Sequence, residues 1–271
     1  MEKHLTVSKS DKFNVDSTAS LSLFLYPESI FIFAKDQNEA ILAIHKYEVE
    51  AEKILELLDS DELLSLSVPL KVFPHSGNFV LVPGALFTKG EEKTYLNFAK
   101  EQDEDSFHFS SGLESGKIQL VGGMSYEIYQ ALLAKYPEVA IHHGASSFLS
   151  YLFHQRQNFL GQEILVNLIG PKLYAACFTD QELVSFGMFD LNTQEDLVKY
   201  PRALMSQHGY HPAHARITVI GKSDSIQSDE EWGKQFYHQY LSSEPKPNQN
   251  LHSGMDAAEN FGILEAFWQF D

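Results

Sequence analysis

A duplicated α/β fold, with two βββαβα lobes following one another along the chain, is the architecture that the sequence predicts. Two observations indicate it: three short apolar strands followed by a helix occur near the start, and the same plan returns in the second half at a constant offset. Composition agrees, because 44% hydrophobic residues, including 20 Phe, can build a substantial core. At roughly 150 residues per domain, 271 residues suit two domains or one large one.

The first copy of the plan starts with apolar runs at 21–26, 30–34 and 40–44. These runs are rich in β-branched and aromatic residues and are separated by turn residues such as Pro27-Glu28-Ser29, a pattern typical of an antiparallel meander. In the next segment, apolar residues recur on one helical face over 51–58. The first lobe is therefore expected to begin with three strands and a helix.

The second copy has its apolar runs at 164–169, 173–178 and 183–188. They start 143 residues after the runs that begin at 21, 30 and 40, and chance does not readily produce such a constant offset. Polar and acidic residues at 193–196 are typical of a helix start, and this helix is expected to run to about 207. A strand at 216–220 follows it.

The stretch between the two meanders is expected to complete the first lobe. We predict an N-terminal lobe at 1–160, with inserted strands and a helix at about 70–116, and a C-terminal lobe at 161–271. The further predicted elements are strands at 70–73, 78–83, 106–110, 117–121 and 139–142, and helices at 84–100, 125–136, 146–157 and 255–268.

Two copies of a βββαβα unit resemble the actin-like ATPase architecture, which is a duplicated ribonuclease H-like fold. The strand-helix-strand-helix order of 117–153 is similar to the corresponding part of pilus-assembly and cell-division actin-like proteins. Three shorter segments resemble the bacterial family called domain of unknown function 3822; they are Phe79–Pro83 with Leu86-Phe87, Tyr95-Leu96-Asn97 and Thr193–Leu197. The resemblance extends over about 21–241 and implies two lobes around a cleft, without an established activity.

The resemblance also implies where a nucleotide would bind. Actin-like ATPases hold the phosphates with the first hairpin of each half, where an Asp-x-Gly lets the backbone approach the ligand and its carboxylate organises magnesium. This sequence contains no Asp-x-Gly. The first hairpin turns through Pro27 and Glu28, so that an amide donor is missing and a negative charge would face a phosphate. The second hairpin keeps Gly170, but Asn167 replaces the acid.

We therefore expect no ATP hydrolysis, no catalytic residues and no cofactor. The alternative is a switch that binds ATP with magnesium in the interlobe cleft by unusual contacts, for which Asn167, Gly170, Gly221, Lys222 and Ser223 are the candidate residues. The last three mimic the end of a P-loop, but an arginine stands five residues before Gly221, where that motif requires a glycine.

Composition excludes several other classes of protein. A net charge of −17 disfavours nucleic acids and anionic membranes as partners. The single cysteine, Cys177, excludes disulfides and cysteine-rich zinc sites, and its apolar neighbours predict an inert core thiol. No apolar run approaches ~18 residues, and the N-terminus lacks a signal pattern, so a soluble cytoplasmic protein is expected. A ribonuclease H-like nuclease would need carboxylates on its first strand, but 21–26 has none.

One histidine cluster leaves a further alternative open. His208, His211 and His214 have a spacing compatible with metal ligands, although a glycine and a proline interrupt any helix that would align them, and a surface loop is the preferred interpretation. Overall, the sequence predicts a non-catalytic scaffold or adaptor that binds another protein through its cleft and exposed sheet edges. Its acidity would speed encounter with a basic partner.

Overall fold

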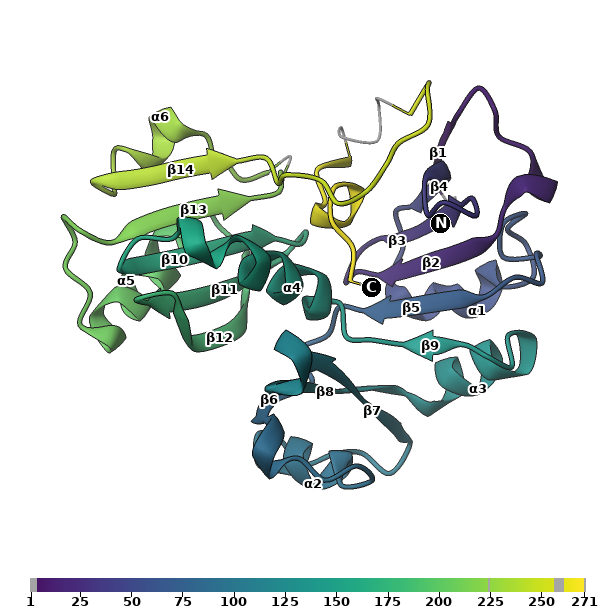
Figure 1. Cartoon of the computed structure of the whole chain (residues 1–271), viewed down its shortest axis with the longest axis horizontal. Coiled ribbons are helices and arrows are strands. Elements are labelled where there is room, and N and C mark those ends of the chain that lie inside the picture. Colours follow the sequence, from purple (N-terminus) through teal and green to yellow (C-terminus); the bar gives the residue numbers. More distant parts are fainter. Residues whose placement is uncertain (1–3, 224, 256–260, 271) are drawn as a thin grey trace. The chain divides into compact units, whose positions relative to one another are not determined.

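The computed structural model describes residues 4–223, 225–255 and 261–270 and divides into two compact units (Figure 1). Unit 1 comprises Met1–Leu149 and Gln249–Ala258, and unit 2 comprises Ser150–Asn248 and Glu259–Asp271. The end of the chain thus returns to unit 1 before it finishes in unit 2.

Unit 1 is built on a six-stranded sheet with the order β1-β4-β3-β2-β5-β9. The central meander of β2 (Ser20–Leu25), β3 (Ile30–Lys35) and β4 (Ile41–Tyr47) is antiparallel, and nearly all of its residues are buried. On one side β1 (Leu5–Lys9) pairs antiparallel with β4; on the other, β5 (Leu70–Pro74) lies parallel to β2, and β9 (Ala140–Ile141) lies parallel to β5.

Helices cover one face of this sheet. Alternate residues of β2, such as Leu21 and Leu23, share a core with Ile54 of α1 (Ile54–Leu57) and Leu132 of α3 (Tyr126–Lys135). The opposite face of β2 carries Phe24, which stacks on a ring of β5. Continuous apolar strands are expected when both faces of a sheet are buried.

A three-stranded antiparallel sheet completes unit 1, with the order β6-β8-β7. It contains β6 (Phe79–Pro83), β7 (Ser106–Leu113) and β8 (Ile118–Ser125), and α2 (Glu92–Asn97) packs on it. The helix predicted over 84–100 is therefore much shorter than expected. Gly90 has a φ of 95°, which a right-handed helix cannot accommodate, so the chain forms only a 3-10 turn before it and α2 after it.

Unit 2 has a five-stranded sheet with the order β12-β11-β10-β13-β14. The antiparallel meander is β10 (Gln162–Leu168), β11 (Lys172–Thr179) and β12 (Glu182–Asp190), while β13 (Arg216–Ile220) and β14 (Gln239–Ser243) run parallel to β10. This order and these directions match β4-β3-β2-β5-β9 of unit 1. The core lies between the sheet and the helices α5 (Asp196–His208) and α6 (Glu230–Gly233).

The last part of the chain differs from the prediction. The helix predicted over 255–268 falls partly on 256–260, which lie outside the described residues; among the described residues of this segment, Phe261 and Leu264–Ala266 are in 3-10 conformation and none is α-helical. Gly262 adopts a left-handed φ of 69°, which ends any helix at that point. The predicted packing still occurs, since Ile263, Leu264 and Trp268 are buried. The remaining long helix, α4 (Ala145–Gln155), lies where the sequence predicts one.

Candidate functional site

Ligands of open α/β sheets bind where parallel strands end at their carboxyl side. In unit 1 this edge is formed by the residues that follow β2, β5 and β9, among them Tyr26, His75 and His143. In unit 2 it is formed by the ends of β10, β13 and β14, which bring Gly221 and Glu244 to the same side of the sheet. Each unit therefore has one candidate ligand edge.

The unit 1 edge is filled by aromatic rings. Tyr26 and His75 are both buried and stack with 4.0 Å between ring centroids and 14° between ring planes. The Tyr26 amide, which could otherwise face a ligand, donates within the turn to the Ser29 carbonyl at 2.9 Å. The β2–β3 turn is thus closed by its own backbone hydrogen bond, and Tyr26 at its start is stacked on His75.

Gly144 also packs closely against the His75 ring. A Cβ atom at Gly144 would lie 2.4 Å from the His75 ring, so only glycine allows this close approach. His143 beside it is fully buried: its Nε2 lies 2.9 Å from the Ser76 carbonyl, and its Nδ1 accepts the Ala145 amide at 3.1 Å. These partners select the neutral tautomer protonated at Nε2.

The histidines of this edge carry no positive charge at neutral pH. Burial lowers the pKa of His143 to about 4, and burial together with the Lys71 charge lowers the pKa of His142 to about 4. Burial and the nearby His143 place the pKa of His75 well below 6.5. The three histidines of the unit 1 edge therefore offer a phosphate no positive charge at neutral pH.

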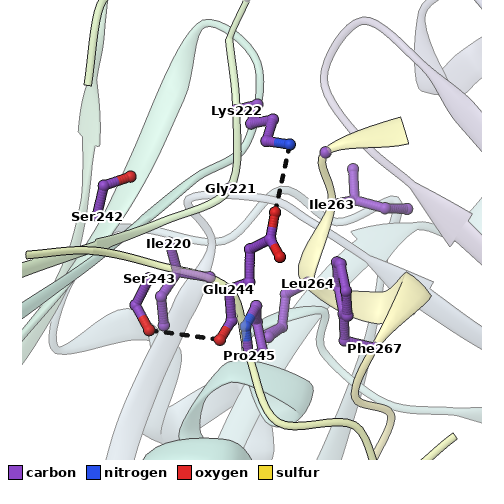
Figure 2. A pocket seen from close by; sticks show the side chains of 11 residues that line it. Ile220, Gly221, Lys222, Ser242, Ser243, Glu244, Pro245, Ile263, Leu264 and Phe267 are labelled. Carbon is purple, nitrogen blue, oxygen red and sulfur yellow. Dashed lines mark hydrogen bonds and ion pairs between the residues drawn. The ribbon is translucent and has the colours of Figure 1, made fainter. Parts of the chain in front are cut away.

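The unit 2 edge contains a cavity of about 380 Å³ (Figure 2), within the size range of small-molecule sites. The ends of β13 and β14 form one side of it, and the segment 262–267 forms the other. Figure 2 shows Lys222 and Glu244 pointing toward each other, and their Nζ and Oε1 atoms are 3.5 Å apart. The Lys222 amide donates to the Gly262 carbonyl at 3.0 Å. The C-terminal segment thus uses a backbone donor that could otherwise bind an anion.

The sequence-predicted residues are only partly brought together here. Gly221 and Lys222 line the cavity. Asn167 is buried next to Gly221, since a Cβ atom added at Gly221 would lie 3.4 Å from Asn167 Oδ1. Among the described residues, neither polar atom of the Asn167 side chain has a hydrogen-bond partner. Gly170 lies in the β10–β11 turn with a φ of 73°, and Ser223 bonds Ser225; neither lines the cavity.

Sequence reasoning did not find Glu244 or the segment 262–267. The strand before Glu244, β14, is an edge strand with mixed polar and apolar residues and gives a weak sequence pattern. The segment 262–267 reaches the cavity only through a long-range return of the chain. In neither case does the sequence carry a local motif.

The three histidines at 208–214 do not assemble into a metal site. His208 Nε2 lies 2.7 Å from Ser185 Oγ, and His211 Nδ1 accepts an amide two residues later, while the His211 and His214 rings are 4.7 Å apart. Over residues 4–223, 225–255 and 261–270, no group of three or more potential metal ligands is present. Cys177 is buried, and burial raises the pKa of its thiol.

Comparison with known proteins places this geometry in a wider family. The family model described as "Protein of unknown function (DUF3822)" matches residues 10–242. No protein of curated function matches the chain. None of the helices in the described parts of the chain is long and apolar enough to cross a membrane.

Two solved structures are similar over most of their length. A Bacteroides thetaiotaomicron VPI-5482 protein with an actin-like ATPase fold and unknown function matches with a TM-score of 0.74 and 16% identity, covering 85% of this chain and 92% of that one. A chain of the PilM–PilN type IV pilus biogenesis complex matches with a TM-score of 0.60 and 9% identity, covering 92% of this chain and 96% of that one. Both predicted resemblances are confirmed: the chain belongs to the DUF3822 family of proteins of unknown function and has the actin-like ATPase fold.

Proposed function

We propose that this protein is a non-catalytic scaffold or adaptor that binds another protein on an actin-like framework. The observation that carries the proposal is the unit 1 edge, where the buried Tyr26 ring at the start of the first hairpin turn stacks on the buried His75 ring. Neither hairpin has the Asp-x-Gly whose carboxylate organises magnesium in actin-like ATPases. We also propose a cytoplasmic location, which cell fractionation would test.

Exposed apolar side chains support a role in protein binding. Beside the three-stranded sheet of unit 1, Leu86 at the end of a 3-10 turn and Phe98 at the end of α2 are 70% and 84% exposed. They flank the stacked pair of Phe87 and Tyr95, since Leu86 precedes Phe87 and Phe98 lies one helical turn after Tyr95. Exposed apolar groups gathered in one region are a common mark of interaction sites. The structurally similar chain of the PilM–PilN type IV pilus biogenesis complex is itself found in a complex.

The alternative is an ATP-responsive switch, and one observation favours it. The unit 2 cavity is lined by Gly221 and Lys222, two of the residues that this alternative requires. Against it, Glu244 places a negative charge 3.5 Å from the Lys222 ammonium, and the Lys222 amide is already bonded to Gly262. We therefore rank the switch second.

Thermal unfolding with and without millimolar magnesium-ATP, ADP or GTP separates these two functions. A ligand at 100 times its Kd adds about 2.7 kcal/mol to the stability of the folded state. For a chain of this size that is several degrees, at roughly 2–4 °C per kcal/mol. We expect no shift of Tm with any nucleotide.

The Lys222→Ala variant is the control for this experiment, since Lys222 is exposed and its replacement should not unfold the protein. A nucleotide-dependent rise in Tm that Lys222→Ala abolishes would contradict the scaffold proposal and support the switch. Crosslinking in cells followed by affinity capture is the positive test. If the wild-type chain captures no protein reproducibly above a tag-only control, the scaffold proposal is wrong.

A further inference from the structure

Unit 2 has a second groove, of about 320 Å³, between α5 and the segment that begins in α6. From the α5 side it is lined by Glu195, Val198, Lys199 and Arg202, whose spacing of three and four residues places them along one helical face. The facing wall is Trp232 and Phe236, which are one turn apart. The groove is thus an open channel with a helix on one side and two aromatic side chains on the other.

The inner wall of the groove is apolar but incompletely covered. Trp232 is buried against the unit 2 core, and its ring lies 5.0 Å from that of Phe236. Phe236 is 37% exposed, although its ring partner is buried. Val198 is partly buried opposite these rings. A further apolar side chain could therefore extend this cluster and be removed from water.

The rim of the groove carries positive charge on a strongly acidic chain. Lys199 is 66% exposed, and its nearest carboxylate contact is Asp196 at 3.8 Å. The Asp196 carboxylate also accepts hydrogen bonds from the backbone amides of Asn192 and Thr193, at 3.1 and 3.0 Å, just before α5. Arg202 is held in place by a 3.2 Å bond to the Phe236 carbonyl and lies over the Tyr237 ring.

Other charged groups also lie near the groove. On α6, Lys234 bonds Glu230 at 2.5 Å, and Glu231 is exposed at the start of the helix. Glu195 lines the groove at its N-terminal end, next to the base of α5. Among the residues that line the groove, the two positive charges of Lys199 and Arg202 outnumber the single negative charge of Glu195, opposite in sign to the net charge of −17.

We propose that this groove binds a protein segment in which one large apolar or aromatic side chain is followed by Asp or Glu. The apolar side chain would pack against Trp232 and Phe236, and the carboxylates would pair with Arg202 and Lys199. Arginine presents several donors in a fixed plane, which suits a carboxylate. Both parts are needed, because an acidic segment meets overall repulsion from the chain and an apolar segment alone gains nothing from the basic rim. The inference rests on the proposed adaptor function and names the chemistry of its partner.

Fluorescence polarisation with labelled ten-residue peptides tests this directly. The probe has a Phe-Glu-Glu core in a Gly-Ser context, and the comparison peptides have Phe-Gln-Gln, Phe-Lys-Lys or Ala-Glu-Glu cores. We expect the Phe-Glu-Glu peptide to bind at least about tenfold more tightly than the other three, the scale of one charge-assisted contact or one buried aromatic ring. Its affinity should fall as salt is added.

Charge-reversal variants provide the matched comparison. Lys199→Glu should weaken binding of the Phe-Glu-Glu peptide by about tenfold or more, and Arg202→Glu should do at least the same. Lys234→Glu makes the same change of net charge on the neighbouring helix but outside the groove, and should change affinity by less than about twofold. Lys199→Glu is the decisive variant, because Arg202→Glu also loses the bond to Phe236.

Two results would overturn the proposal directly: equal binding of all four peptides, or an equal effect of Lys199→Glu and Lys234→Glu on peptide affinity. A third would be free phenylpropionate binding as tightly as the peptide, which would indicate a small-molecule site. The two proposals fail separately. A protein captured by the wild type and equally by Lys199→Glu would leave the adaptor function in place and refute the groove. Capture of nothing by the wild type would refute the adaptor function itself.

Discussion

Asp61 joins two distant parts of unit 1 through four hydrogen bonds. Its Oδ2 accepts the Tyr47 hydroxyl at 2.7 Å and lies 2.7 Å from His45 Nδ1, which attaches it to β4. Its Oδ1 accepts the amides of Leu63 and Leu64, which fixes the turn after α1. Burial opposes ionisation, but the bonds from His45 and Tyr47 prevail and lower the pKa of Asp61 below 3.8. This side chain is therefore a buried, fully engaged carboxylate.

Replacing Asp61 with Asn should lower the free energy of unfolding by about 1–3 kcal/mol at pH 7, because the amide leaves buried donors without an acceptor. A carboxylate with a depressed pKa in the folded state stabilises the protein above its unfolded pKa and ceases to do so as pH falls below about 4. The difference between wild type and Asp61→Asn should therefore shrink in acid, which urea unfolding at several pH values would measure. Asp59→Asn is the control, since Asp59 is 94% exposed and should change stability by less than about 0.5 kcal/mol. A constant difference down to pH 3 would contradict this account.

At the scale of elements, the residues that follow β2, β5 and β9 pack closely: Tyr26 stacks on His75, and Gly144 approaches the same ring. Gly144→Ala should lower stability by about 1–3 kcal/mol, because the added methyl group would overlap the His75 ring. Combining it with His75→Ala removes that overlap, so the double variant should be clearly less destabilised than the sum of the two single variants. Additive effects in denaturant unfolding would show that the contact is not the cause.

The elements also show how far sequence reasoning reached. Continuous apolar strands such as 21–26 and 164–169 were predicted correctly, because each is buried on both faces and is bounded by clear turns. The helix predicted over 84–100 is shortened to α2, and the described end of the helix predicted over 255–268 is not α-helical, since Gly90 and Gly262 adopt left-handed backbone that the sequence pattern does not indicate. The sequence singled out Gly221 and Lys222, which follow a strong strand. Glu244 and the segment 262–267 reach the same cavity only through tertiary contacts.

For the molecule as a whole, the neutral buried histidines predict sensitivity to mild acid. The pKa of both His142 and His143 is about 4 in the folded protein, against about 6.5 for an unfolded chain. Below pH 6.5 the unfolded state therefore binds more protons, and stability should decline from there toward pH 4. Proton uptake by the folded form ends this decline only near pH 4.

The decline is measurable as the change of the urea midpoint between pH 7.5 and 4.5. Each buried histidine should contribute about one proton to the slope, so His142→Asn should reduce the slope by about one proton. Replacing His238, which is exposed, with Asn should leave the slope unchanged. A wild-type stability that does not vary between pH 7.5 and 5 would refute this prediction.

The returning tail has a consequence for how the protein is made. Residues 250–252 bond β4 in unit 1 through Ile41, and residues 262–269 bond Lys222 and Asn248 in unit 2. A ribosome delivers these residues after every strand they contact, and domains often begin to fold as they emerge. In a nascent chain, the strands of both sheets are therefore synthesised before the residues from 250 onward that bond to them. A premature stop before residue 249 would leave both units incomplete at once, and such a product should be a ready target for proteolysis.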